Sequence, residues 1–349
     1  MIDLINPELV ACDAESLPWL GTRFDSLVHR ADDQYRFLHD NAIVCHGGSL
    51  FAAWYNCPQG EIVGESCIRS RSSRDRGRTW SPVDVIAADH EGRGIHYVPV
   101  AFCAWGHRLL AFVSNMIGHD QVTHCEVLEL DISNDIWRSR GFIAEHFLPN
   151  CAPIRMNNGS YIMFGRVAES SAVKPAYPAA ALQDGDDLTA PWRIVRLSDK
   201  KLPLHPESTA WIDGSCVTAL VRGGPNGGVH LFLSRDFGQT WEGPLANNLP
   251  AANSKLYAGK LHNGQRYLVW NWPDTSQQRR NILVIGVSRP GHDQLDAIWR
   301  IRHGADANLS CGPEWSYPCA VENEGELFVI YTSEKKHSVL TVIPSGIIR

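Results

Sequence analysis

Two arginines occupy matching places in the sequence, each at the end of an apolar run. Arg166 ends "YIMFGR" and Arg222 ends "CVTALVR". If both runs are strands that end at one edge of the fold, the two guanidinium groups converge and can hold a carboxylate through paired hydrogen bonds. A lone arginine at a strand end more often forms a surface salt bridge, which is the alternative explanation. The pair predicts a site for an acidic ligand.

Side chains that can transfer protons stand at the beginnings of similar runs. A histidine titrates near neutral pH, so His39 in "LHDNAIV" suits a general acid or base at the mouth of a channel. The alternative is a buried His39 that bonds a backbone group. The predicted proton-handling residues are His39, Glu207, Tyr317 and His96.

Further polar residues flank the same apolar runs and could bind sugar hydroxyl groups. Loop positions on a rigid scaffold are where binding sites concentrate. Polar residues also stand at strand ends simply because water reaches them there, so part of this set can be solvated surface. The predicted binding residues, besides the two arginines, are Asn56, Glu61, Asn115, His205, Lys255, Tyr257 and Asn271.

These residues need a scaffold that brings strand ends together, and the sequence contains a repeat that can do so. Six segments each have an apolar strand, a tight turn with glycine and a second apolar strand, as in "STAWIDGSCVTALVR". Asn-Gly and Asp-Gly turns between apolar runs indicate β-hairpins. The turn glycines lie 50 to 61 residues apart, at Gly48, Gly106, Gly159, Gly214, Gly264 and Gly325.

A tryptophan follows each of the first five hairpin turns by about 30 residues, after a polar turn. Units of this length with four antiparallel strands are typical of propeller blades. We therefore predict an all-β, six-bladed β-propeller of four-stranded antiparallel blades. Seven blades are the alternative, if residues 1–30 hold a further blade. Residues 1–349 would then form a single domain whose N-terminal segment closes the ring by adding a strand to the last blade.

The polar turn before two of these tryptophans is nearly identical. "SRDRGRTW" at 73–80 and "SRDFGQTW" at 234–241 share Ser-x-Asp-x-Gly-x-Thr-Trp. Its Ser and Asp can bond within the turn and its Gly can adopt a positive φ, so a structural role is predicted for it. The phrase resembles the Asp-box, or bacterial neuraminidase repeat, of the sialidase superfamily. The resemblance covers essentially the whole chain and implies an active site on the axis, on the face opposite the Asp-boxes.

The sialidase resemblance also implies particular site residues. Sialidases carry three arginines for the substrate carboxylate, a Tyr nucleophile paired with a Glu, and an Asp acid. Tyr317 in "WSYP" could be that tyrosine. The first arginine of the family opens blade one, where this chain has His39, unless the register moves to Arg36. The arginines that could bind a carboxylate are Arg166 and Arg222, with Arg280 as a further candidate.

Superfamily members with a first-blade histidine act on uronate- or rhamnose-containing glycans, and this chain is similar to them in "LHD" and "AAWYNCPQGEIVGE". The resemblance therefore predicts an exo-acting glycoside hydrolase on an oligosaccharide with an acidic sugar, uronate or sialate-like. His39 and Glu207 would flank the scissile bond. A uronate-directed lyase, which uses β-elimination and a His with Tyr257 or Tyr317, is the first alternative. A non-catalytic glycan-binding propeller is the second.

Charge and composition argue against other classes of protein. A net charge of −6 and a pI of about 6.2 indicate no basic surface for nucleic acid or an anionic membrane. No apolar run is long enough for a membrane span. The ten cysteines form no Cys-x-x-Cys pair, and phosphate-binding glycine motifs are absent, so no metal or organic cofactor is expected. Because no leader pattern is seen, a cytoplasmic location is expected, with a replaced leader as the alternative; the oligomeric state stays open.

Overall fold

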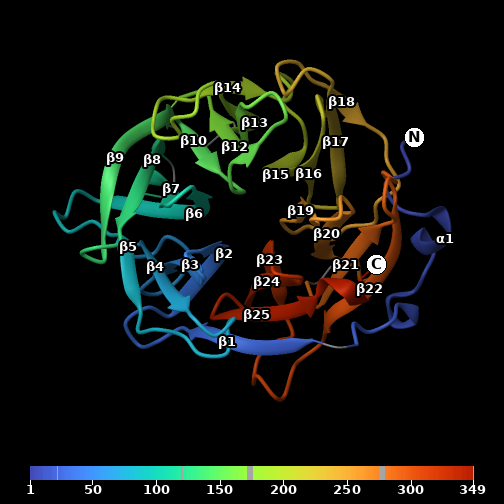
Figure 1. The fold of residues 1–349 in the computed structure, drawn as a ribbon, viewed down its shortest axis with the longest axis horizontal. Helices are drawn as coiled ribbons and strands as arrows, with labels where there is room; N and C mark the ends of the chain where they lie inside the picture. The colour runs from blue at the N-terminus through green and yellow to red at the C-terminus, as the bar shows by residue number, and fades with distance from the viewer. Residues whose placement is uncertain (22, 119–120, 171–175, 275–279, 349) are drawn as a thin grey trace.

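The computed structural model describes residues 1–21, 23–118, 121–170, 176–274 and 280–348. Within these ranges the strands form six antiparallel sheets, which are arranged as blades around a central axis (Figure 1). The prediction of an all-β, six-bladed propeller is confirmed. The seven-bladed alternative is wrong, because the described residues of the N-terminal segment contribute one strand to an existing sheet and form no sheet of their own.

The first three blades follow one another along the chain, each from an inner strand at the axis to an outer strand at the rim. Blade one contains β2 (Phe37–His46), β3 (Ser49–Cys57), β4 (Cys67–Ser73) and β5 (Asp84–Ala87). Blade two contains β6 (Ile95–Trp105), β7 (Arg108–Ile117), β8 (Gln121–Asp131) and β9 (Ile136–Glu145). Blade three contains β10 (Phe147–Pro149), β11 (Ile154–Arg155), β12 (Tyr161–Ala168), β13 (Ala176–Gln183) and β14 (Arg193–Arg196), with β10 and β11 both paired to β12.

The last three blades repeat this order, and the sixth takes its outer strand from the beginning of the chain. Blade four contains β15 (Leu204–Asp213), β16 (Cys216–Gly224), β17 (Gly227–Ser234) and β18 (Glu242–Leu245). Blade five contains β19 (Tyr257–Lys260), β20 (Arg266–Asn271), β21 (Ile282–Ser288) and β22 (Leu295–His303). Blade six contains β23 (Trp315–Asn323), β24 (Glu326–Ser333), β25 (His337–Pro344) and β1 (Phe24–Arg30).

The N-terminal segment closes the ring. Strand β1 pairs antiparallel with β25, with Ser26 opposite Leu340. Before β1, the chain runs along the rim of blades four and five and forms single bridges to both of them. The short helices are α1 (Pro7–Val10), η1 (Ala14–Ser16) and η2 (Ser345–Ile347), and none in the described part of the chain is long and apolar enough to cross a membrane.

Hydrophobic packing between neighbouring sheets joins the blades. One cluster unites blades six and one, where Trp54 lies among Phe328 and Leu340. Each sheet packs between two neighbouring blades, so both of its faces are covered. Some strands are therefore apolar on both faces, and β21, with the sequence "ILVIGVS", is buried throughout. This packing makes the inner strands a rigid frame for side chains at the axis.

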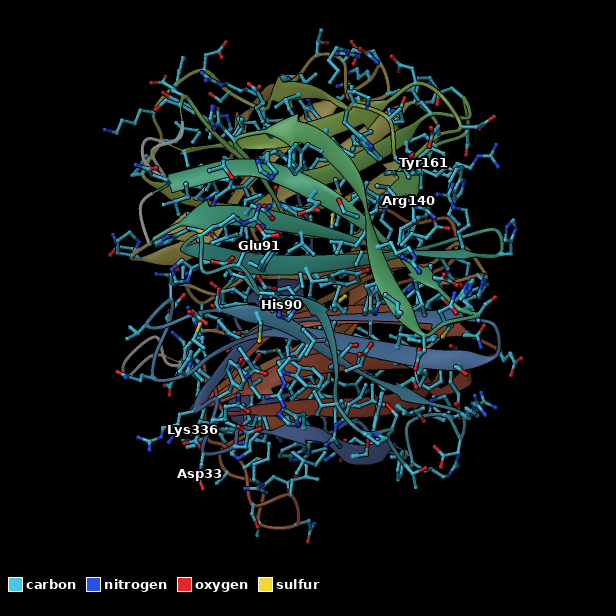
Figure 2. The ribbon with its side chains drawn as sticks, turned by 90° about the vertical axis from the view of Figure 1, so that its left-hand side faces the viewer. Asp33, His90, Glu91, Arg140, Tyr161 and Lys336 are labelled. Atoms are coloured by element: carbon cyan, nitrogen blue, oxygen red, sulfur yellow. The ribbon has the colours of Figure 1, made fainter. Side chains whose placement is uncertain are left out.

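The ring has two distinct ends. The β-hairpin turns and the Asp-boxes share one end, since Ser73 of the first box lies opposite Leu50, next to the turn at Gly48. We call this the hairpin end, and the other, where each inner strand begins, the loop end. In the side view of Figure 2, Tyr161 lies toward the hairpin end, and Asp33 and Lys336 lie at the loop end.

The two Asp-boxes have the predicted structural role. In the first, the Ser73 hydroxyl donates to Asp75 and accepts from the Gly77 amide, both at 2.8 Å, and Asp75 also accepts from the backbone and hydroxyl of Thr79. Hydrogen bonds from Thr79 lower the pKa of Asp75 to about 2. The second box repeats the same bonds with Ser234, Asp236, Gly238 and Thr240. The carboxylates therefore hold a turn closed at the hairpin end.

Gly77→Ala is expected to cost about 2–4 kcal/mol of unfolding free energy. Gly77 has a φ of +84°, and a Cβ there would lie 2.3 Å from Cδ2 of the fully buried Leu340. Gly48→Ala is the matched control, because Gly48 has a φ of +76° but open space around its Cβ position. The control should cost only about 1 kcal/mol. Urea denaturation measures both, and equal losses would contradict the packing argument.

Candidate active site

The inner strands of four blades contain a β-bulge near the loop end. In blade one, His39 pairs with Tyr55 and Ala42 pairs with Ala53. Strand β2 therefore has two residues between these pairs where β3 has only one. An extra residue in one strand bends it and redirects its side chains. Corresponding irregularities lie between Tyr97 and Val100 in β6, Leu204 and Ser208 in β15, and Ser316 and Cys319 in β23. The bulges therefore decide which residues face the axis.

Two bulge residues have strained backbones. Asp40 in blade one has a φ of 52°, and Tyr317 holds the equivalent place in blade six with a φ of 57°. Residues other than glycine rarely adopt this left-handed conformation, which costs about 1–3 kcal/mol and is concentrated at functional sites. The two equivalent bulges therefore give this part of the loop end a conformation that favours it as a candidate site.

Tyr317 makes contacts with groups from several blades. Its hydroxyl accepts a hydrogen bond of 2.9 Å from Nη1 of Arg222, and its ring centroid lies 4.0 Å from that of His39. Burial and the Glu207 carboxylate raise the pKa of the phenol to about 12, although Arg222 and Arg280 act in the opposite direction. The phenol is thus protonated at neutral pH and has a cationic donor already directed at its oxygen.

Arg222 connects Tyr317 with Glu207. Its Nη1 lies 3.4 Å from Oε1 of Glu207, and its Nε donates to Oδ1 of Asn253 at 2.7 Å. Burial favours the neutral acid at Glu207, but Arg222 and Arg166 outweigh it and hold the pKa of Glu207 below its usual value. Glu207 is therefore ionised, and its buried Oε2 has no hydrogen-bond partner among the described residues.

Arg280 supplies a second guanidinium group to Tyr317, from the segment before β21. Its guanidinium carbon lies 5.3 Å from the centroid of the Tyr317 ring. Its Nε donates to the backbone oxygen of Asn253 at 3.2 Å, and its Nη1 lies 3.6 Å from Glu314. Asn253 thus holds Arg222 through its side chain and Arg280 through its backbone, which orients both cations toward the same phenol.

His39 is buried against Tyr317, whereas the sequence predicts it at the mouth of a channel. Only 2% of its surface is exposed, and its buried Nδ1 has no hydrogen-bond partner among the described residues. Burial and the positive charges of Lys335 and Arg280 hold the pKa of His39 well below its usual value. His39 is therefore neutral near pH 7, which permits a role as a base but not as a general acid.

Asp40 and Lys255 form a buried ion pair in the same region. Oδ1 of Asp40 lies 2.5 Å from Nζ of Lys255, and Nζ lies 5.8 Å from the centroid of the Tyr317 ring. Burial raises the pKa of Asp40, although Lys255 opposes the effect. We call the whole group the axial cluster: Tyr317, Arg222, Glu207, Arg280, His39, Asp40 and Lys255.

Three predicted asparagines at the ends of second strands have their amides engaged within the fold. The Asn56 amide donates to the Phe37 backbone oxygen at 2.8 Å and accepts from Trp54 at 2.6 Å. Asn271 donates to the backbone oxygens of Trp315 and Ile282. Asn115 donates to Glu126 and contacts His124. These donor groups hold neighbouring strands together, whereas the buried Oδ1 atoms of Asn115 and Asn271 have no hydrogen-bond partner among the described residues.

The other predicted residues are distributed over several blades. Glu61 is exposed in the turn after β3, and its carboxylate accepts hydrogen bonds from Tyr55 at 3.4 Å and from Lys335 at 3.2 Å. Tyr257 is half-buried near Cys319, and burial of its hydroxyl raises its pKa well above the usual value. The remaining positions are Arg166 at the end of β12, His205 beside Glu207 in the β15 bulge, and His96 in β6 opposite Met116.

Arg36 and His39 lie in different surroundings in blade one. Arg36 is exposed before β2, whereas His39 contacts Tyr317. Sequence reasoning did not select Asp40 as a site residue, missed Asn253 and gave Arg280 little weight. One sequence signal was available, because prolines stand within three of the four bulges, at Pro99, Pro206 and Pro318. Among the described residues, no three His, Cys, Asp or Glu side chains form a group that could hold a metal ion.

Comparisons with known proteins agree with this architecture. The family model of the BNR repeat-like domain matches residues 48–330. A protein of unknown function from Dyadobacter fermentans superposes with a TM-score of 0.72 at 13% identity, over 93% of this chain and 99% of that one. The Hadza microbial sialidase Hz136 superposes with a TM-score of 0.71 at 15% identity, over 92% of this chain and 68% of the enzyme.

A third solved structure is Trypanosoma rangeli sialidase in complex with sialic acid. It superposes with a TM-score of 0.68 at 12% identity, and the match covers 95% of this chain but 60% of the trypanosome enzyme. No curated protein sequence matches the chain. At these identities the structural matches show a common fold.

Proposed function

Because the chain belongs to the family defined by the BNR repeat-like domain, we propose that it is an exo-acting glycoside hydrolase. Its substrate would be an oligosaccharide that ends in an acidic sugar, a uronate or a sialate-like sugar. The observation that carries the proposal is the convergence of Tyr317, Glu207, Arg222 and Arg280 at the loop end. Trypanosoma rangeli sialidase, which shares the fold, binds sialic acid and forms a covalent intermediate with a difluoro analogue.

The acidic group of the sugar would be bound by Arg222 and Arg280. Guanidinium groups form paired hydrogen bonds with carboxylates, and both arginines are fixed by Asn253 before any ligand arrives. Their existing partners, Glu207 and Glu314, lie at 3.4 and 3.6 Å, longer than a strong charge-assisted hydrogen bond. The guanidinium donors can therefore also serve a ligand carboxylate.

Tyr317 would act as the nucleophile. Its oxygen forms a bond to the anomeric carbon while the bond from that carbon to the leaving oxygen breaks, and Glu207 accepts the phenol proton. Arg222 stabilises the negative charge that develops on the phenol oxygen. The leaving oxygen would take a proton from solvent at the loop end. Water would then attack the anomeric carbon and release the sugar, and Tyr317 would recover its proton from Glu207.

A uronate lyase is the second candidate, and the contact between His39 and Tyr317 favours it. A neutral histidine with an unpartnered nitrogen could remove the proton next to a uronate carboxylate that Arg222 and Arg280 hold. The bond to the leaving oxygen would then break as a carbon–carbon double bond forms, and Tyr317 would donate its phenol proton to that oxygen. His39 would afterwards pass the abstracted proton to Tyr317.

Turnover of a substrate panel tests the proposal. The panel contains aryl sialosides, aryl glucuronides, aryl rhamnosides and rhamnose–glucuronate oligosaccharides. Two signals report turnover: release of reducing sugar, and the ultraviolet absorbance of unsaturated uronates. We expect reducing sugar from an acidic substrate without new absorbance. New absorbance would favour the lyase, and binding without turnover of any substrate would favour a glycan-binding propeller.

A further inference from the structure

The Asp40–Lys255 ion pair reaches across blade six to lie beside Tyr317. Asp40 comes from blade one and Lys255 from the segment before β19 of blade five, the two blades that flank blade six in the ring (Figure 1). The two side chains are 9% and 6% exposed, and the ammonium nitrogen lies 5.8 Å from the Tyr317 ring centroid. A full positive and a full negative charge are therefore fixed close to one phenol.

Folding alone gives no reason for this arrangement. A buried ion pair is commonly no more stabilising than well-packed hydrophobic residues of the same size. The Asp40 backbone is also held in the left-handed region, which is unfavourable for an aspartate. Both unfavourable features lie next to Tyr317, so an electrostatic effect of the ion pair on the Tyr317 phenol explains them better than stability does.

We propose that Lys255 and Asp40 are positioning residues that act in opposite directions on the pH at which Tyr317 loses its proton. The ammonium group favours the phenolate and the carboxylate opposes it, so each charge offsets the shift that the other alone would cause at Tyr317. The inference about ionisation rests on the geometry of the pair, and only its consequence for turnover rests on the proposed function.

Other charged and titratable groups also face Tyr317 and must stay constant in a test. They are Arg222 and Glu207 of blade four, Arg280 of blade five, and His39 with Tyr55 of blade one. Burial and Glu207 raise the pKa of Tyr317, and Asp40 adds to this effect. Substitutions confined to Asp40 and Lys255 leave these neighbours in place, so a changed titration reports on the ion pair.

The experiment places a difluorotyrosine at position 317 and follows its titration by fluorine NMR in the full-length protein. The fluorines lower the phenol pKa into a range where the protein can stay folded, and they give a signal from this residue alone. The variants, each with this label, are Asp40→Asn, Lys255→Met, Lys255→Arg and the double variant Asp40→Asn/Lys255→Met.

The two single neutral substitutions should shift the midpoint in opposite directions. Asp40→Asn should lower it by roughly one pH unit, because an opposing negative charge is lost, and Lys255→Met should raise it by roughly one unit. The double variant should return close to the original midpoint, because equal and opposite charges are removed together. Lys255→Arg should leave it unchanged. Shifts in the same direction, or none, would overturn the proposal.

Two further measurements keep the test decisive: the comparison of the two Lys255 variants, and the pH dependence of kcat. If Asp40→Asn fails to fold, as judged by its melting curve, the comparison of Lys255→Met with Lys255→Arg still decides the question, because only the former removes the charge. The alkaline limb of kcat should move in the same direction as the NMR midpoint. If the midpoints shift as expected but no glycoside is turned over, the proposed function fails while the role of the ion pair stands.

Discussion

Tyr317→Phe is expected to lower kcat on an acidic glycoside about a thousandfold, with little change in KM. The substitution removes the hydroxyl oxygen, which accepts a hydrogen bond of 2.9 Å from Arg222 and would attack the anomeric carbon. The ring stays against His39, so the site keeps its shape. Steady-state kinetics on the most active substrate of the panel measure the effect.

Tyr331→Phe is the matched control for this prediction. Tyr331 is also a buried tyrosine of blade six, and its hydroxyl bonds Arg302 and Thr341, both at 2.6 Å, in β22 and β25. Losing that hydroxyl should cost about 1 kcal/mol of stability and leave kcat unchanged. If Tyr317→Phe retained wild-type kcat, Tyr317 would not be the nucleophile. If both variants lost turnover alike, the loss would reflect general damage to blade six.

Arg222→Met is expected to reduce kcat/KM for acidic substrates about a thousandfold, equivalent to about 4 kcal/mol of transition-state binding. The variant loses a carboxylate donor and the donor to Tyr317, and it leaves Glu207 without its closest cation. The measurement compares a substrate that carries the carboxylate with its analogue in which an alcohol replaces it. The loss should be smaller for the alcohol, because that substrate depends on Arg222 only through Tyr317 and not through a carboxylate.

Arg266→Met supplies the comparison for a buried arginine outside the axial cluster. Arg266 is 8% exposed in its side chain and pairs with Asp213 and Asp293, near the hairpin end. Its substitution should lower stability and leave kcat/KM unaffected. Equal losses for the acidic substrate and its alcohol analogue in Arg222→Met would show that Arg222 does not read the carboxylate.

The sequence alone determined the blades because their signals are local. A hairpin requires a turn residue with positive φ between two apolar runs, and the six turn glycines satisfy this within about ten residues of chain. The Asp-box is local for the same reason, since the hydrogen bonds of its Ser and Asp side chains join residues at most four positions apart. Six such units at regular spacing leave the propeller as the arrangement that covers both faces of each sheet.

The candidate site was decided by tertiary structure, because it depends on which side chains turn toward the axis. One extra residue in β2 and one in β23 redirect Asp40 and Tyr317, and periodicity does not reveal such a bulge except where a proline marks it. The sequence pointed to Arg222, Glu207 and Tyr317 as strand-end residues, and the fold brings them together. It pointed equally to Asn56 and Asn271, whose amides bond neighbouring strands.

Burial separated residues that the sequence could not tell apart. His39 has the type and place of a channel-mouth histidine, but packing against Tyr317 and nearby cations keeps it neutral and covered. The partnership of Asp40 with Lys255 joins positions 215 residues apart, and no local pattern encodes it. Local turn chemistry is written in short stretches of chain, whereas charge and direction at the axis arise only when strands from all parts of the chain meet.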